Sequence, residues 1–452
     1  MAAACGPQPD GHTVDYEKFF SARAKTMPQN PFVHLLPLMR NPENKVLCQG
    51  VPPAEIFPLQ SMSVSLVDGT TLELDNSDTQ LAQRYPPFAW TPLRQWITEH
   101  VRDIHAPACS NWEISIAAGS MSAIDLACAA LLDRGDYVLS EEYSFMASFD
   151  AFQSYGSNIV PIAMDQDGLV PDALEKACQL LQEKGQSAKV LYMVPVGHNP
   201  TGTILATSRY EAIYEIAQRF DFLIIEDDAY FYQQHTLRNT QVGHQAGFSG
   251  SLGLDKTCDD DLPGLRLGPS FLSYDKDGRV LRLDSFSKVL APGFRLGWVT
   301  GPQPLVAKYD ALAYASSANG CSLSMMLLGK LLQAWGPAGF EAHLRKLQGS
   351  LRARCDAIVA AADKHLGDVA AWTRPKAGMF LWVKLHKPPQ EMSHLLTLME
   401  ENGIVVMPGN YCKSPGSDRE NLCPYVRLSF VIDEGEYSDA IMRFACLAGA
   451  NV

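Results

Sequence analysis

A lysine that follows an apolar run is the first candidate for chemistry in this sequence. Lys288 lies in SFSKVLAPGFRLGW, between the apolar runs VLRLDSF and LGWVTG. Burial disfavours the protonated form of an amine and makes it a nucleophile toward carbonyl carbon. Ser285, Ser287 and Arg295 are close in sequence, and hydroxyl groups with a guanidinium are suited to bind a phosphate. A solvated lysine at a strand end is the alternative interpretation.

Two further motifs also follow apolar runs. HNPTGT begins at His198, directly after VLYMVPV. NPTG on its own is a turn, but at the carboxyl end of a parallel strand Asn199 can reach a ligand. In IIEDDAYF, Asp227 and Asp228 precede Tyr230. A carboxylate with a phenol nearby is suited to a ligand ring nitrogen; an N-cap or solvated carboxylates are the alternatives.

The elements that must position these residues alternate along the chain from about Asn111. Amphipathic helical segments, one of them over Ala123–Leu132, separate several short apolar runs. This alternation predicts βαβ units, hence an α/β fold with a mostly parallel sheet and helices on both faces. The seven predicted strands are EISIAAGS, YVLS, NIVPIAM, KVLYMVPV, DFLIIEDD, VLRLDSFS and LGWVTG.

After about Pro337 the pattern changes to that of a smaller α+β unit. A long helix over 339–366 is expected there, followed by the strands MFLWVKL, GIVVMPG and YVRLSFV. Helices are predicted over Met392–Asn402 and Gly435–Ala448. The segment 233–273 is rich in Gly and Asp and is expected to be a surface loop, with a lid as the alternative.

We therefore divide the chain into three parts. An N-terminal segment, 1–100, is expected to contribute to the small domain. A large α/β domain follows over 101–337, and a C-terminal small domain over 338–452; the resemblance given below implies that 101–337 binds the cofactor and that 1–100 contributes to a dimer interface.

Composition excludes several classes of protein. The 452 residues are 46% hydrophobic and 19% charged, which is unlike a disordered chain, a coiled coil or a collagen-like fibre. The net charge of -13 argues against a nucleic-acid partner, and no apolar run is long enough to predict a membrane span. Eleven scattered cysteines without a C-x-x-C pair indicate neither a zinc site nor a disulfide scaffold. We expect no metal and a cytoplasmic location.

The motifs together resemble the signature of fold type I, class I and II aminotransferases, which use pyridoxal 5'-phosphate (PLP). The resemblance rests on NPTG from Asn199, on Asp227-x-x-Tyr230, and on SFSK ending at Lys288 with Arg295 following. The residues around these motifs, including the segments DSFSKVLAPGFRLGWVTGP and PYVRLSF, are most similar to those of the aromatic and kynurenine/2-aminoadipate aminotransferase group. The chain has His198 where many relatives carry Gln.

The resemblance implies roles around the cofactor ring. Lys288 would bind the cofactor covalently and carry a proton during the reaction. Asp227 would pair with the pyridine nitrogen, and Asn199 and Tyr230 would hydrogen-bond the phenolic oxygen of the ring. Tyr143 would stack on the ring face, with ordinary core packing as the alternative.

It also implies a phosphate site. Gly119, Ser120 and Met121 would begin a helix whose N-terminus holds the phosphate, together with Ser285, Ser287 and Arg295. Tyr85 would reach the phosphate bound by a neighbouring subunit, which implies a homodimer with shared active sites.

Substrate contacts follow from the same resemblance. Arg427 would bind the substrate α-carboxylate, with a backbone contact from Gly50 nearby. Arg23 would turn toward acidic substrate side chains; a solvated surface arginine is the alternative.

The implied activity is a PLP-dependent, ping-pong transfer of an amino group from an aromatic amino acid, kynurenine or 2-aminoadipate to a 2-oxo acid such as 2-oxoglutarate. A β-lyase or decarboxylase on the same cofactor is one alternative. A PLP-sensing transcription regulator is another, although the first 100 residues show neither a helix-turn-helix pattern nor a basic patch.

Overall fold

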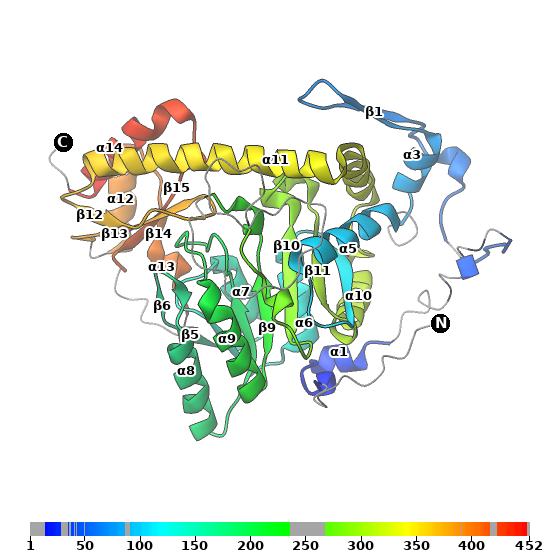
Figure 1. Cartoon of the computed structure of the whole chain (residues 1–452), viewed down its shortest axis with the longest axis horizontal. Coiled ribbons are helices and arrows are strands. Elements are labelled where there is room, and N and C mark those ends of the chain that lie inside the picture. Colours follow the sequence, from blue (N-terminus) through cyan, green and yellow to red (C-terminus); the bar gives the residue numbers. More distant parts are fainter. Residues whose placement is uncertain are drawn as a thin grey trace. The chain divides into compact units, whose positions relative to one another are not determined.

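The structure of the chain is a computed structural model, coloured along the sequence in Figure 1. Most of the 233–273 loop lies outside the part that it describes. The described residues are 14–28, 35, 38–39, 41, 43–48, 50–85, 91–235, 267–389, 391–415 and 423–449.

The described residues form two compact units that each combine separate stretches of chain. Unit 1 combines Met1–Leu132 with Asp275–Phe340. Unit 2 combines Asp133–Tyr274 with Glu341–Val452. The division into 1–100, 101–337 and 338–452 remains a prediction.

The main sheet has seven strands in the order β3-β11-β10-β9-β8-β4-β5, which confirms the predicted α/β fold class. Each of the seven predicted runs forms one of its strands. They are β3 (Trp112–Ala117), β4 (Tyr137–Glu141), β5 (Asn158–Ile162), β8 (Ala188–Met193), β9 (Leu223–Asp227), β10 (Val280–Ser285) and β11 (Gly297–Pro302).

The main-sheet strands of unit 2 are parallel, and β4, β8 and β9 are buried along most of their length. β4 pairs with β5 and with β8, and β8 pairs with β9, all in the parallel sense. Every residue of β9 is buried, as expected for a strand covered on both faces. The carboxyl ends of β4, β8 and β9 therefore meet at one edge of the sheet.

The strands of unit 1 include an antiparallel member that the sequence pattern did not distinguish. β11 is antiparallel to both β10 and β3. Gly297 pairs with Ser285 on one side and with Ala117 on the other. The end of β3, the start of β11 and the end of β10 therefore form one row.

Short two-stranded sheets accompany the main sheet. β1 (Met62–Ser65) pairs with β2 (Thr71–Leu74), and β6 (Met164–Asp165) pairs with β7 (Gly168–Leu169).

The helices of the described residues fall in both units. In unit 2, α8 and α9 lie side by side (Figure 1). The helices are α1 (Ala22–Thr26), α3 (Asn76–Ala82), α5 (Thr91–His105), α6 (Ser120–Leu131), α7 (Met146–Ser154), α8 (Pro171–Glu183), α9 (Thr207–Phe220), α10 (Gln303–Ser317), α11 (Ser322–His365), α12 (Met392–Asn402), α13 (Gly409–Cys412) and α14 (Tyr437–Leu447).

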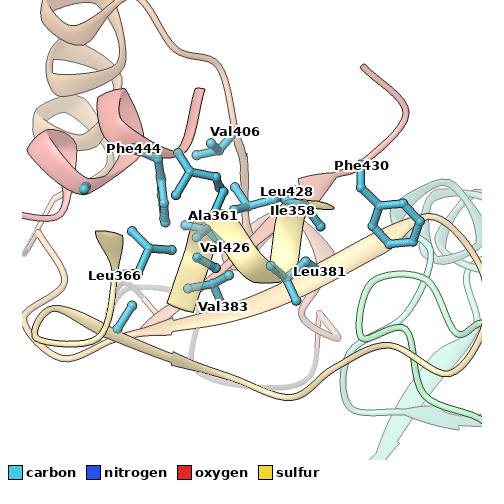
Figure 2. Close-up of a cluster of buried hydrophobic side chains, with 14 of the residues drawn as sticks. Ile358, Ala361, Leu366, Leu381, Val383, Val406, Val426, Leu428, Phe430 and Phe444 are labelled. Carbon is cyan, nitrogen blue, oxygen red and sulfur yellow. The ribbon is translucent and has the colours of Figure 1, made fainter. Parts of the chain in front are cut away.

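A second sheet, in unit 2, has the order β12-β13-β15-β14. Its strands are β12 (Ala370–Trp372), β13 (Phe380–Leu385), β14 (Met407–Pro408) and β15 (Tyr425–Ser429). Side chains alternate across a strand, and one face of β13 and β15 contributes Leu381, Val383, Val426 and Leu428 to a buried apolar cluster (Figure 2). The opposite face is therefore left for polar and aromatic side chains.

Several predicted boundaries were wrong. The element α11 runs over Ser322–His365, but the non-helical backbone of Gly336 divides it into two helices, and the long helix expected over 339–366 corresponds to the second. The helix predicted over Ala123–Leu132 begins at Ser120, and the last helix begins at Tyr437 after a 3-10 turn. Only Met407 and Pro408 of GIVVMPG form a strand. Met392–Asn402 was predicted correctly.

Asp310 on α10 provides a test of packing in unit 1. Burial raises the pKa of this carboxyl to about 6, opposed by the hydrogen bond that Ser115 donates. The folded chain therefore holds a proton that the unfolded chain, with a pKa near 3.8, releases. This contribution to stability is present below pH 4 and is lost as the pH rises toward 6.

We predict that Asp310→Asn, which keeps an acceptor for Ser115, is more stable than the wild type above pH 7, by about 1–3 kcal/mol. The advantage should shrink as the pH falls toward 4. Thermal unfolding at several pH values measures it, with the exposed Asp103→Asn as the control. A stability difference that does not change with pH would contradict the prediction.

Candidate active site

The predicted site residues fall into two groups, one in each unit. Unit 1 holds the predicted phosphate-binding residues and Lys288, and unit 2 holds the predicted ring- and carboxylate-binding residues. The first group is Gly119, Ser120, Met121, Ser285, Ser287, Lys288 and Arg295, and the second is Tyr143, Asn199, Asp227, Tyr230 and Arg427.

The phosphate group of residues converges because of the strand row in unit 1. Arg295 lies two residues before β11, and its guanidinium extends toward the end of β3 and the turn after β10. It donates to the Ala118 carbonyl at 3.4 Å and to Ser287 Oγ at 3.5 Å. Ser285 Oγ in turn accepts from the Ser287 backbone N–H at 3.1 Å. We call this arrangement, with the N-terminus of α6, the cup.

Glycine is required at the start of α6. Gly119 is the N-cap, has a φ of +86°, and provides no side-chain cap. A Cβ at this position would lie 3.0 Å from Arg295 Cζ and closer still to Nη2. The first N–H groups of a helix have no partner within the helix, and the helix dipole favours an anion there. The cup therefore has the donors that a negatively charged group requires, as expected for the predicted phosphate site.

Lys288 belongs to the same part of unit 1. It ends the 3-10 turn Phe286–Lys288 that follows β10, and the Phe286 side chain in this turn is buried. Anchoring of the turn by Phe286 and by the Ser285 hydroxyl fixes the backbone that carries the amine. The lysine as a whole is partly exposed.

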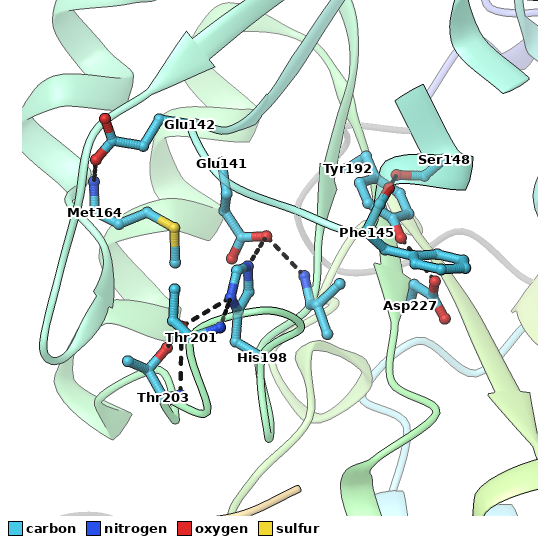
Figure 3. A network of polar contacts seen from close by, with 11 residues as sticks. Glu141, Glu142, Phe145, Ser148, Met164, Tyr192, His198, Thr201, Thr203 and Asp227 are labelled. Carbon is cyan, nitrogen blue, oxygen red and sulfur yellow. Dashed lines mark hydrogen bonds and ion pairs between the residues drawn. The ribbon is translucent and has the colours of Figure 1, made fainter. Parts of the chain in front are cut away.

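In unit 2, the parallel strands bring the second group together. Asp227 is the last residue of β9, and its carboxylate accepts a hydrogen bond from Tyr192 Oη of β8 at 2.7 Å (Figure 3). Both side chains are buried. Burial, together with the Asp227 charge, raises the pKa of Tyr192 well above its ordinary value, so the phenol remains a donor. Sequence analysis missed Tyr192, although a tyrosine in a predicted fully buried strand needs a hydrogen-bond partner.

Asn199 connects two other predicted residues. Its Oδ1 accepts from Arg427 Nη1 at 2.5 Å, and its Nδ2 donates to Tyr230 Oη at 3.5 Å. Burial, followed by the Asp227 charge, raises the pKa of Tyr230, whose hydroxyl therefore stays protonated at neutral pH. The amide thus orients both a cation and a phenol.

The face of β13 and β15 that lies opposite the apolar core carries the rest of this group. Arg427 lies over the Phe380 ring at 4.2 Å, and Trp382 is opposite Arg427 in the strand register. Trp382 and Tyr425 stack with 5.2 Å between ring centroids, and Tyr143 meets both rings edge-on. A cation that can bind a carboxylate thus lies beside aromatic side chains. Phe380 and Trp382 are further residues that sequence analysis did not identify.

Two glycines allow the turn before Asn199 to pack closely. A Cβ on Gly197, which has a φ of +58°, would lie 2.8 Å from the Gly378 backbone nitrogen and 2.9 Å from Tyr230 Cβ. The turn that carries Asn199 therefore packs backbone to backbone against the segment that leads into β13.

Three predicted residues lie outside both groups. Gly50 and Tyr85 are exposed, and Tyr85 shows 54% of its surface to solvent. Arg23 is exposed on α1, although the helix itself is held in place, because Ser21 Oγ donates to the Ala129 carbonyl at 2.6 Å. Their roles remain predictions.

The donor sets fit PLP. The cup offers a guanidinium, hydroxyls and a helix N-terminus for a phosphate, and Lys288 offers an amine for an aldehyde. Asp227 offers a buried carboxylate for a protonated ring nitrogen, and Asn199 and Tyr230 offer donors for a phenolate. Within the described residues, no group of acidic, histidine and cysteine side chains is placed to hold a metal ion. In the same part of the chain no helix is long and apolar enough to cross a membrane.

Comparison with known proteins gives a consistent result. Residues 61–443 match the family model "Aminotransferase class I and II". The chain is 31% identical over 455 residues to the kynurenine/alpha-aminoadipate aminotransferase, mitochondrial, of Bos taurus, covering 96% of this chain and 99% of the relative. It is 32% identical over 397 residues to an aromatic amino acid aminotransferase of Schizosaccharomyces pombe, covering 82% of each.

Among solved structures, the chain resembles the aminotransferase Aro8 from Candida albicans. The TM-score is 0.81 at 27% sequence identity, over 96% of this chain and 98% of that one. These findings favour amino transfer over the regulator, lyase and decarboxylase alternatives.

The cup generates a direct test. We predict that Gly119→Ala weakens phosphate binding by roughly tenfold or more, because the new Cβ displaces Arg295, and one charge-assisted hydrogen bond contributes about 1.5–3 kcal/mol. Calorimetry with inorganic phosphate on the cofactor-free protein measures it. Gly135→Ala is the matched control, since Gly135 has a φ of +93° but no atom within 4 Å of the added Cβ. Equal losses in both variants would assign the effect to backbone strain.

Proposed function

Because the chain belongs to the class I and II aminotransferases, which depend on PLP, we propose that it transfers the amino group of an aromatic amino acid, kynurenine or 2-aminoadipate to a 2-oxo acid such as 2-oxoglutarate. The reaction would be ping-pong: the donor leaves as its 2-oxo acid before the acceptor enters. Both substrates then use one carboxylate site in turn.

The contact between Arg427 and Asn199 carries the proposal. All candidate donors and acceptors share a carboxylate next to the reacting carbon. Arg427 is held at 2.5 Å by Asn199 and is supported by the Phe380 ring at 4.2 Å. A guanidinium fixed in this way can bind a carboxylate through two parallel hydrogen bonds, which orients the substrate as well as binding it.

The aromatic side chains next to Arg427 support an aromatic donor. Phe380 lies under the guanidinium, and Tyr143, Trp382 and Tyr425 form a group of touching rings. Aromatic rings favour offset-stacked or edge-to-face partners. The names of the bovine and fission-yeast relatives point to the same class of substrate.

When bound, PLP withdraws electrons from the substrate α-carbon and carries the amino group between the two half-reactions. We propose that Lys288 holds the cofactor covalently and then moves a proton to and from the α-carbon. Asp227, oriented by Tyr192, keeps the ring nitrogen protonated, and the cup holds the phosphate. Asn199 and Tyr230 donate to the phenolic oxygen.

Two finer proposals concern assembly and location. We propose a homodimer in which Tyr85, exposed in the single chain, reaches the phosphate bound by the other subunit. Sedimentation at twice the mass of one chain would support the homodimer.

We propose a cytosolic location because the scattered cysteines are typical of a reducing compartment. The bovine relative is named as mitochondrial, so cell fractionation is the experiment that distinguishes the two locations.

Lys288→Ala should lose covalent attachment of the cofactor, and turnover should fall by roughly a thousandfold or more, because nucleophile and proton carrier are removed together. Borohydride reduction followed by peptide mass spectrometry locates the cofactor. Lys308→Ala, which changes a lysine that donates to the Ala24 carbonyl, should keep attachment. Cofactor found on another lysine of the wild type would contradict the assignment.

Arg427→Ala should raise the KM of every donor and acceptor by roughly 100-fold, because each presents the same carboxylate.

Arg23→Ala should raise KM only for 2-oxoglutarate and 2-aminoadipate, and leave the KM of phenylalanine and of tryptophan unchanged. A panel of donors with 2-oxoglutarate, read by oxo-acid formation, gives both results. Release of CO2, or of pyruvate with ammonia, would contradict transamination, and equal losses in Arg23→Ala would assign Arg23 a structural role.

A further inference from the structure

We propose that His198 and Glu141 are positioning residues, which hold the turn that carries Asn199 and thereby set Arg427 for the substrate carboxylate. Neither residue is among the predicted ligand-binding residues, and each acts through Asn199. This inference rests on the carboxylate-binding role proposed above for Asn199 and Arg427.

The two side chains form a buried pair. His198 Nε2 lies 3.1 Å from Glu141 Oε2, and their side chains expose only 1% and 2% of their surface (Figure 3). The same Glu141 oxygen accepts a hydrogen bond from the Val194 backbone N–H at 3.1 Å. A buried carboxylate requires such donors, and removal of one leaves a charge that is costly to bury.

The second ring nitrogen of His198 fixes the turn from the inside. Nδ1 lies 2.8 Å from Thr201 Oγ1, and the Thr201 backbone N–H donates to it at 3.4 Å. Thr201 Oγ1 also lies 2.9 Å from Thr203 Oγ1. Nδ1 thus faces the turn and Nε2 faces the Glu141 carboxylate, so the two ring nitrogens contact different segments of the chain.

The backbone of the same residue closes the turn. The His198 N–H donates to the Thr203 carbonyl at 3.0 Å, and the His198 carbonyl accepts from the Gly202 N–H at 2.7 Å. The backbone N–H, the carbonyl and Nδ1 of His198 therefore all bond within the segment 198–203, while Nε2 lies beside the Glu141 carboxylate of β4. These contacts fix the backbone of the turn and therefore the position of Asn199, the next residue.

Glu141 connects this turn to another predicted site residue. It is the last residue of β4, two positions before Tyr143. Through Val194 and His198 it joins the end of β4 to the segment after β8. One buried carboxylate thus holds both the ring-stacking candidate and the carboxylate-orienting amide in register.

The side-chain chemistry of histidine at this position differs from that of glutamine. A glutamine amide can donate to Glu141, but its donor and acceptor lie at one end of the side chain. It cannot also accept from Thr201 on the opposite side, as the two nitrogens of an imidazole ring do. His198→Gln should therefore keep the link to Glu141 and lose the link to Thr201.

A double-mutant cycle tests the inference. The readout is the Kd of 3-phenylpropionate, a carboxylate without an amino group, measured by calorimetry on the PLP-loaded enzyme. His198→Ala should raise this Kd about tenfold, and His198→Gln by less. In an Asn199→Ala background both His198 changes should have no further effect, because His198 acts through Asn199. KM should rise for donor and acceptor by the same factor.

The matched control is His105→Gln, a change at a buried histidine of α5, which should leave the Kd unchanged. Effects of His198 and Asn199 that add would overturn the inference, because a merely structural histidine does not act through the amide. If His198→Ala fails to fold, His198→Gln in the same cycle decides the question. An unchanged Kd in Asn199→Ala alone would instead overturn the proposed carboxylate site itself.

Discussion

The hydrogen bond between Arg427 and Asn199 is the interaction on which the rest of unit 2 depends. A half-buried guanidinium must have an acceptor, and the acceptor here is the amide of a turn residue 228 positions away in sequence. The bond therefore joins β15 to the turn after β8. Because Asn199 also donates to Tyr230, the same amide extends the connection to the segment after β9. Three distant segments take their positions from one side chain.

Alternation along β13 and β15 allows a single pair of strands to serve both stability and chemistry. Leu381 and Val426 point into an apolar core, while Phe380, Trp382 and Arg427 lie on the opposite face. A shift of one residue in the register would exchange the two faces and bury the arginine in the core. The core thus fixes the register, and the register fixes where the cation lies.

Residues that follow buried strands were the ones that sequence could identify. Lys288, Asn199 and Asp227 each come directly after an apolar run, where parallel strands present side chains to a ligand. Tyr192 and Glu141 could not be found in the same way, because their partners come from other strands and only the register brings them together. Gly336 and Pro337 do mark a break in α11, because the backbone of Gly336 is not helical, but the segment before them, from Ser322, is helical as well and was not predicted. The antiparallel direction of β11 could not be predicted either, because the hydrophobic pattern of a buried strand is the same in both directions.

The contact between Gly197 and Gly378 has a consequence for how this protein can diverge. Most packing contacts can drift, since an enlarged side chain on one partner is compensated by a smaller one on the other. Here both partners already lack a side chain, and a Cβ on either would enter the backbone of the other. No second substitution can restore the space, because no residue is smaller than glycine. Neither glycine can therefore be replaced, whereas the apolar side chains around them can be replaced by others of similar volume.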